Sequence, residues 1–235
     1  YIMVLDICEV QYELWGLRGF MMNKNKEIQR EGQLFIFSAP SGGGKSSVIK
    51  RLLQELDDIQ LSVSVTTRPM REGETEGKDY YFIEEDKFKA LVKEKALYEY
   101  VDSDFGPKYG TPKEPVDKLL KQGKDVILDL DYPGVQQLRK LAGDRVKTIA
   151  LLPPSLKILR ERLEKRGTDT PEVIEKRMKM AAKRIRESAF YDYVIVNDDL
   201  EQAVEQAKSV IVAARAERDK MCRFDEFLNG ISEEG

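Results

Sequence analysis

A lysine and two serines follow a cluster of small residues where an apolar segment ends. The apolar segment is QLFIFS (33–38), and the residues after it are Ala39, Pro40, Ser41, Gly42, Gly43, Gly44, Lys45, Ser46 and Ser47. Consecutive glycines let backbone N–H groups turn inward onto an anion, and an amphipathic helix expected at 45–56 adds the positive end of its dipole. This arrangement is typical of a loop that binds nucleotide phosphates.

The loop fits the phosphate-binding pattern G-x-x-x-x-G-K-[ST] at every position except the first, where Ala39 replaces glycine. In that pattern Lys45 reaches the β- and γ-phosphates, and Ser46 places its hydroxyl on Mg²⁺. The alternative is a flexible glycine-rich turn that is followed by a lysine and a serine by chance. The strand pattern before the loop and the helix pattern after it favour the phosphate-binding interpretation.

The elements that must position this loop alternate between strand and helix. Strand patterns fall at 33–38, 61–65, 125–130, 146–152 and 193–197, and helical patterns fall at 45–56, 133–141, 155–165 and 171–188. Thr170 is placed to cap the last of these helices, and Pro171 suits its first position. This alternation predicts an α/β fold in which a parallel sheet is covered by helices on both faces.

Three segments depart from the alternation. Residues 66–112 are rich in Gly, Pro, Thr and Tyr, and they predict an inserted small lobe with a mixed or antiparallel sheet. Residues 1–31 end in a polar run and are expected to be a partly disordered extension outside the main fold. An alternative for them is an amphipathic helix that makes the contact in a homodimer. Residues 221–235 are expected to form a C-terminal tail.

The composition argues against several classes of function. Histidine is absent, which removes catalytic triads, general acids and metal ligands based on it. The formal net charge of −3 argues against a general nucleic-acid binder. No run reaches the ~18 apolar residues that a membrane span needs. With only two cysteines, Cys8 and Cys222, a disulfide framework is not expected, and a reducing cytoplasm is the expected location.

Two blocks of the sequence, SAPSGGGKSS and SVSVTTRPMREGETEGKDYYF, resemble the guanylate kinase family, whose members transfer a phosphoryl group from ATP to GMP. The resemblance continues through KYGTP, ILDLD, RLEKRGTDTPEVIEKR and YDYVIVND. It implies a kinase domain at 32–220, in which the core comprises 32–65, 113–156 and 171–220, a GMP-binding lobe comprises 66–112 and a mobile lid comprises 157–170. It also implies ATP as phosphoryl donor, Mg²⁺ as the metal, GMP and dGMP as substrates and a role in purine nucleotide metabolism.

The resemblance assigns the phosphate of GMP to a group of arginines and phenols. Arg68, Arg71, Tyr80 and Tyr109 match the family residues that bind it, and Gly110 follows the second phenol. A guanidinium suits a phosphate because it donates two parallel hydrogen bonds. We therefore expect these residues to converge, although arginines in a loop and tyrosines in a core are common without any such role.

The guanine edge of GMP carries N1–H and N2–H₂ donors beside an O6 acceptor. Glu99 matches the family carboxylate that reads the donors, and Ser64 and Thr111 match the hydroxyl residues that bind the rest of this edge. Asp131 matches a further carboxylate on the substrate side. Asp129 is expected near the phosphates, where it organises Mg²⁺ through water. For these acids the alternative is an ordinary solvated charge.

Positive charge around the transferring group matters more than a general base, because the accepting phosphate of GMP is already anionic. The implied catalytic residues are Lys45, Arg71, Arg166 and Arg177. The implied ATP contacts are residues 39–47, Arg162 and Asn197. The other basic residues of this stretch are expected to lie on solvated helix faces, namely Lys165, Lys176, Lys179, Lys183 and Arg184.

Two other functions share part of this signature. Guanylate-kinase-like scaffold modules bind protein partners without catalysis, and they have degraded phosphate-binding loops and lack several arginines of the lid. This chain keeps Lys45, Arg166 and Arg177. Another nucleoside-monophosphate kinase would share the glycine-rich loop but should lack the block SVSVTTRPMREGE. A coupled assay with GMP, AMP, UMP and dTMP separates the three.

Overall fold

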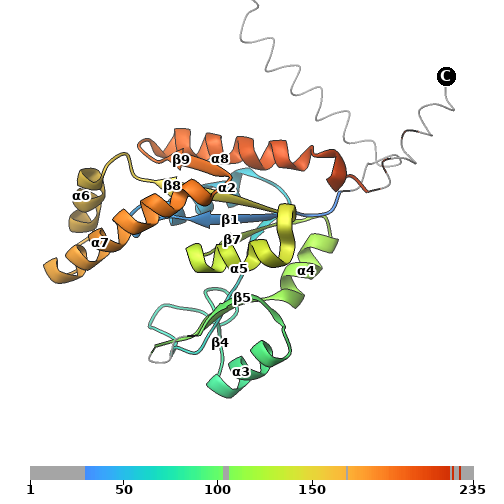
Figure 1. Cartoon of the computed structure of the whole chain (residues 1–235), viewed down its shortest axis with the longest axis horizontal. Coiled ribbons are helices and arrows are strands. Elements are labelled where there is room, and N and C mark those ends of the chain that lie inside the picture. The colour runs from blue at the N-terminus through green and yellow to red at the C-terminus, as the bar shows by residue number, and fades with distance from the viewer. Residues whose placement is uncertain (1–29, 103–105, 168, 223, 225–227, 229–235) are drawn as a thin grey trace, which may run out of the picture. The chain divides into compact units, whose positions relative to one another are not determined.

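The computed structural model of the chain describes residues 30–102, 106–167 and 169–222, together with residues 224 and 228 (Figure 1). The chain divides into two compact units, one of residues 32–215 and one that combines residues 1–31 with 216–235. In the second unit the short helix η3 (Arg218–Lys220) is described, and the Glu31 N–H donates to the Lys220 carbonyl at 3.1 Å. The expected extension and C-terminal tail fall almost wholly outside the described residues and remain predictions.

The larger unit is built on a parallel sheet of five strands in the order β2-β7-β1-β8-β9. The strands are β1 (Leu34–Ser38), β2 (Ile59–Leu61), β7 (Asp125–Asp129), β8 (Val146–Leu152) and β9 (Tyr193–Val196). β1 lies at the centre, where Leu34 pairs with Val126 of β7 on one side and with Val146 of β8 on the other. β1 is buried along its whole length, as is usual for a parallel strand that is covered on both faces.

Helices cover both faces of this sheet (Figure 1). The four helices that do so are α2 (Lys45–Glu55), α4 (Lys113–Lys121), α5 (Tyr132–Ala142) and α8 (Leu200–Arg215). α2 and α8 pack on one face around Phe35, and α4 and α5 pack on the other around Ile36. Because successive side chains of a strand point to opposite faces, these neighbours enter separate cores. The predicted α/β architecture is therefore confirmed.

Two further helices follow β8 in the chain. They are α6 (Leu156–Arg166) and α7 (Pro171–Glu187), and the short helices η1 (Gly143–Arg145) and η2 (Ser188–Phe190) join the neighbouring elements. α7 begins as predicted, with the Thr170 hydroxyl accepting from the Val173 N–H at 3.5 Å. α6 makes up most of the predicted lid, and it packs on α7 through Leu159 and Leu163. No helix in the described part of the chain is long and apolar enough to cross a membrane.

The inserted lobe (residues 66–112) carries the second sheet, together with the start of β3 just before it. Its strands, in the order β4-β3-β6-β5, are β3 (Val65–Thr66), β4 (Tyr81–Phe82), β5 (Leu97–Val101) and β6 (Tyr109–Pro112). β3 runs parallel to β4 and antiparallel to β6, so the sheet is mixed. α3 (Glu85–Lys93) closes its small core through Phe88.

The strand that alternation predicts at 61–65 is wrong as a single element. Leu61 ends β2 and pairs with Ile127 in the large sheet, whereas Val65 begins β3 and pairs with Gly110 in the lobe. The chain passes from one sheet to the other between these two residues. Alternating side chains indicate extended backbone, but they do not say which partner strand each half will find.

Candidate active site

The glycine-rich loop (residues 39–46) connects the end of β1 to the start of α2 and turns on its glycines. Gly42 and Gly44 have φ angles of 86° and 90°, which other residues rarely adopt. The Gly43 N–H donates to the Pro40 carbonyl at 2.8 Å and closes the turn. α2 then begins at Lys45 without a side-chain cap, and the Ser47 and Val48 N–H groups donate to the Gly44 carbonyl. The N–H groups of Lys45 and Ser46, at the positive end of the helix, can therefore serve an anion.

Asn197 holds the loop against the end of β9. Its side-chain Nδ2 donates to the Gly43 carbonyl at 2.8 Å, and the residue is only 5% exposed. A Cβ placed on Gly44 would lie 2.0 Å from the same Nδ2 atom. Gly44 is therefore required twice, once by its backbone angle and once by the close approach of this amide.

We expect Asn197→Ala to lower the free energy of unfolding by about 1–3 kcal/mol, because it leaves the Gly43 carbonyl without its buried donor. Urea denaturation of the variant and the parent measures the difference. Asp198→Ala, on the exposed neighbouring side chain, is the matched control and should change stability by less than about 0.5 kcal/mol. Equal effects from the two variants would contradict this role for the amide.

Two arginines of α7 reach the same loop. Arg177 donates to the Ser41 hydroxyl at 3.0 Å and pairs with Asp169 at 2.8 Å. Arg184 donates to the Ala39 carbonyl at 3.3 Å and pairs with Asp131. The expectation that Arg184 lies on a solvated helix face is thus wrong. Arg177 lies beside the loop, and its contact with phosphate stays a prediction. Arg184 follows Arg177 by seven residues, about two helical turns, so both lie on the same face of α7. That spacing was the available signal.

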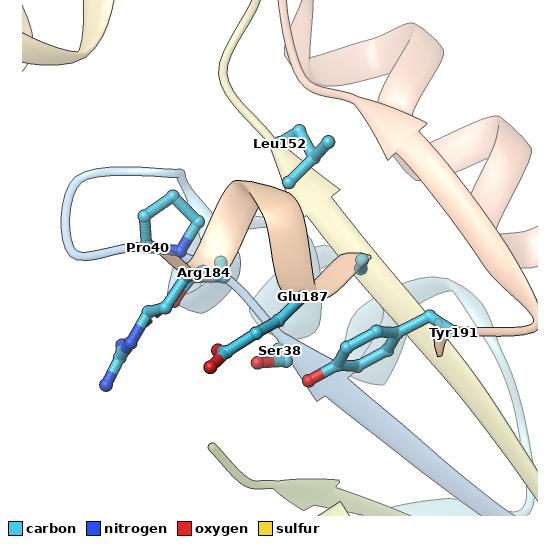
Figure 2. Close-up of a pocket in the computed structure, with 8 residues that line it drawn as sticks. Ser38, Pro40, Leu152, Arg184, Glu187 and Tyr191 are labelled. Carbon is cyan, nitrogen blue, oxygen red and sulfur yellow. Dashed lines mark hydrogen bonds between the residues drawn. The ribbon is translucent and has the colours of Figure 1, made fainter. Parts of the chain in front are cut away.

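A small pocket of about 10 Å³ lies beside the loop, between β1, β8 and the end of α7. Figure 2 shows the polar ends of Glu187 and Tyr191 on the same side as the Ser38 hydroxyl, with Arg184 reaching past Pro40. Burial raises the pKa of Tyr191, and the hydrogen bond with Ser38 opposes that rise. The pocket has room for about one water molecule and extends the polar surroundings of the loop.

Lys45 and Asp129 form an ion pair that joins the loop to the end of β7. The Lys45 side chain is 17% exposed and that of Asp129 is 51% exposed, and Ser46 is exposed at the start of α2. Among the described residues no group of three or more acids or cysteines could hold a metal ion by itself. One carboxylate and one hydroxyl nevertheless fit Mg²⁺, which usually keeps several waters and takes further oxygens from substrate phosphates.

In the inserted lobe, three of the predicted phosphate ligands are brought together. The Arg68 guanidinium lies 5.0 Å from the centre of the Tyr80 ring, and the rings of Tyr80 and Tyr109 meet edge to face at 5.9 Å. Arg71 lies three residues after Arg68 in the chain, and its side chain is exposed. Gly110 follows Tyr109 in β6 and is buried. The lobe therefore presents a cation and two phenols within one small area.

Glu74 completes this cluster, and the sequence reasoning missed it. Its two carboxylate oxygens accept from the two terminal nitrogens of Arg68 at 2.7 and 2.5 Å, and one of them also accepts from the Arg71 N–H at 2.9 Å. These bonds hold the pKa of Glu74 at about 2. Because the pair is formed within a loop, no helical or strand periodicity signals it. The only hint in the sequence is an acid placed close to two arginines.

A buried carboxylate lies deeper in the lobe. Glu99 is 5% exposed and accepts from the Thr111 hydroxyl at 2.7 Å, and Thr111 itself is 1% exposed. Burial raises the pKa of Glu99, while the bonds from Thr111 oppose the rise. Ser64, the third residue predicted here, is half-buried just before β3. The structure thus brings Glu99 and Thr111 together, and their contact with guanine stays a prediction.

The end of β7 lies within electrostatic reach of the lobe. The charge of Asp131 adds to the rise in the pKa of Glu99, and the charge of Asp129 adds to that of Tyr80, which burial mainly causes. The glycine-rich loop and the lobe cluster therefore border a common region.

The predicted lid arginines occupy different surroundings. Arg162 donates to the backbone carbonyl of Asn197 at 3.0 Å, close to the glycine-rich loop. Arg166 is exposed in the last turn of α6, and among the described residues no hydrogen bond or ion pair links it to that loop. Whether Arg162 and Arg166 bind phosphate stays a prediction.

Comparison with known proteins agrees with this geometry. A family model for guanylate kinase matches residues 31–214. The chain is 46% identical over 199 residues to a guanylate kinase from Zymomonas mobilis, which covers 84% of this chain and 91% of that protein. It is 44% identical over 204 residues to one from Novosphingobium aromaticivorans, covering 87% and 92%. The crystal structure of guanylate kinase from Anaplasma phagocytophilum is 32% identical with a TM-score of 0.69, covering 85% and 95%. The chain therefore belongs to the guanylate kinase family.

Proposed function

We propose that this protein transfers the γ-phosphoryl group of ATP to GMP, and also to dGMP, in purine nucleotide metabolism. An oxygen of the GMP phosphate attacks the γ-phosphorus, the bond from that phosphorus to the bridging oxygen breaks, and ADP leaves as GDP forms. The reaction needs alignment and charge neutralisation rather than a general base. That requirement suits a chain without histidine.

The observation that carries the proposal is the buried Glu99–Thr111 pair in the lobe that also holds Arg68. A carboxylate kept out of water beside a hydroxyl is suited to the N1–H and N2–H₂ donors of guanine, with Ser64 nearby as a further partner. Arg68, Arg71, Tyr80 and Tyr109 then bind the phosphate of the same nucleotide. One lobe thus offers a matched polar site for each end of GMP.

The ATP side is the glycine-rich loop, which we propose is a P-loop. Lys45 exchanges Asp129 for the β- and γ-phosphates, and the first N–H groups of α2 donate to the same anion. Arg177, and Arg166 once the lid closes, add positive charge around the transferring group. Mg²⁺, held by the Ser46 hydroxyl and through water by Asp129, would neutralise part of the phosphate charge.

A coupled assay of ADP formation from ATP tests the proposal with GMP, AMP, UMP and dTMP as acceptors. Guanylate kinase activity predicts rapid turnover with GMP and little with the others. Turnover with another monophosphate instead would indicate a different nucleoside-monophosphate kinase. No turnover with any of the four would support the scaffold interpretation, in which the lobe binds a protein partner.

The buried carboxylate also predicts how the reaction responds to pH. Because the pKa of Glu99 is raised, its charge is lost at a higher pH than that of an ordinary glutamate, and the KM for GMP should rise as the pH falls toward that pKa. The pKa of Glu74 at about 2 keeps the Arg68 pair intact over the same range. A profile of KM against pH from 8 to 5 measures the effect.

Glu99→Gln is the control for this profile, because the phosphate of GMP itself titrates near pH 6 in both proteins. In the variant the KM for GMP should still rise as the phosphate is protonated. The further rise that comes from protonation of Glu99 should be absent. Protonation of Glu99 does not itself unfold the protein. A carboxyl group with a raised pKa binds protons more readily in the folded state, so its protonation stabilises the fold as the pH falls. Identical profiles for the two proteins would count against the role of Glu99.

We further propose a cytoplasmic location, which the low number of cysteines supports. A homodimer also belongs to the proposal, and sedimentation of the full chain tests it directly. A general nucleic-acid partner is not part of the proposal, because the net charge is −3.

A further inference from the structure

Gly134 lies in the first turn of α5, directly behind the Glu99 carboxylate. A Cβ placed on it would lie 3.0 Å from Oε2 of Glu99, 3.4 Å from its Cδ and 3.5 Å from its Cγ. The backbone of Gly134 is helical and does not require glycine. Glycine costs ~1 kcal/mol relative to alanine inside a helix. Glycine is therefore favoured at this position because it has no side chain.

Two hydrogen bonds hold α5 close to β5 beside Glu99. The Gln137 side chain donates to the Tyr100 carbonyl at 2.9 Å and accepts from the Tyr100 N–H at 3.2 Å, so it binds the backbone of β5 next to Glu99. Gln137 and Gly134 are three residues apart and lie on the same face of α5. This double hydrogen bond sets the spacing between α5 and β5, and Gly134 makes that spacing compatible with the Glu99 side chain.

The carboxylate is thus held from two sides. Thr111 donates to its Oε1, and the first turn of α5, where the helix dipole is positive, lies against its Oε2. The positive end of a helix favours the ionised form of an acid, which offsets part of the cost of burying this one. The remaining lone pairs of the two oxygens are left for donors that enter from the substrate side.

We propose that Gly134 is a specificity-determining positioning residue, which fixes the Glu99 carboxylate in the place where it reads guanine. The inference rests on the proposed function, because it takes GMP as the substrate. Gly134 itself touches neither the base nor the phosphate. It acts by leaving space beside the carboxylate, because the three atoms nearest to an added Cβ all belong to Glu99.

Gly134→Ala tests this role through effects of opposite sign. The KM for GMP should rise about tenfold, because a shift of ~1 Å in a positioned group can cost on the order of 10²-fold and the carboxylate must give way by less than that. The KM for ATP should stay within about twofold, and the thermal midpoint should be equal or higher, because alanine is the better helix former. Gln136→Ala, on the exposed face of the same helix, is the control and should change none of the three.

A double-mutant cycle with Glu99→Asp separates positioning from a general effect on the helix. The shorter aspartate withdraws from the added methyl group, so Glu99→Asp should cost clearly less in the Gly134→Ala background than in the parent protein. Strict additivity would overturn the proposal. So would an unchanged KM for GMP, parallel increases in both KM values, or a variant that fails to fold, since the methyl group would then meet something other than the carboxylate.

The outcome is distinguishable from failure of the proposed function. If the parent protein does not phosphorylate GMP, the function itself is wrong, and the variant is not needed to show it. If the parent turns over GMP and Gly134→Ala behaves like Gln136→Ala, only the role of Gly134 is wrong.

Discussion

Lys45→Ala is expected to lower kcat by on the order of 10²–10³-fold, as for other preorganised charges that act on a developing negative charge. Lys45 lies at the start of α2, where it pairs with Asp129. The charge it neutralises grows as the phosphoryl group leaves ADP. The loss should therefore appear mainly in kcat rather than in the KM for GMP. Steady-state kinetics with both substrates varied measure the split.

Lys50→Ala is the matched control, because Lys50 is exposed on the same helix. It should leave kcat within about twofold, and both variants should keep the circular dichroism spectrum and thermal midpoint of the parent. Turnover of Lys45→Ala near the parent rate would mean that the loop is not catalytic. Under the scaffold interpretation the parent protein would have no kinase activity, so neither substitution could lower it.

The second large effect concerns base choice, where the kcat/KM for GMP should exceed that for AMP by ~10⁴–10⁵-fold. Adenine presents a lone pair at N1 where guanine presents a donor, so AMP would set that lone pair against the Glu99 carboxylate and leave buried groups unpaired. dGMP should be accepted as a substrate alongside GMP. Parallel kcat/KM measurements with GMP, dGMP and AMP give these ratios.

Glu99→Gln should remove about 1–3 kcal/mol of this selectivity, or about 5- to 150-fold in kcat/KM for GMP. The KM for ATP should hardly change. Glu94→Gln provides an exposed glutamate in the same lobe as a control, and it should have no effect on either nucleotide. If the parent protein accepts AMP within about tenfold of GMP, the guanine assignment is wrong.

Elements with a strong internal pattern could be predicted from the sequence. β1 and α2 come from a continuous apolar run and a helical spacing on either side of the glycines, and both are found within about one residue of their predicted bounds. The start of α7 carries its own cap and proline, so Thr170 fixes it locally. Signals of this kind need no knowledge of distant parts of the chain.

Contacts between distant segments could not be predicted in this way. Arg184 resembles its basic neighbours on α7, and only the folded chain brings it to Asp131 and the Ala39 carbonyl. Similarly, the ion pair of Glu74 with Arg68 depends on the path of the loop between them. Gly134 left a faint signal, because an isolated glycine inside a helical pattern usually has a packing or functional reason. The identity of its neighbour, however, required the three-dimensional structure.

The central position of β1 has a consequence for how the chain is made. Gln33, just before this strand, donates from its backbone to Asp125 and from its side chain to the Ala214 carbonyl, residues that lie 92 and 181 positions later. At a synthesis rate of ~5–20 residues per second, the ribosome adds the first of these partners about 5–20 s after Gln33 and the second roughly 10–35 s after it. Until β7 and β8 have been added, the nascent chain carries an apolar strand with no neighbour on either edge. A chaperone that shields apolar segments would therefore matter most for this protein before β8 has left the ribosome.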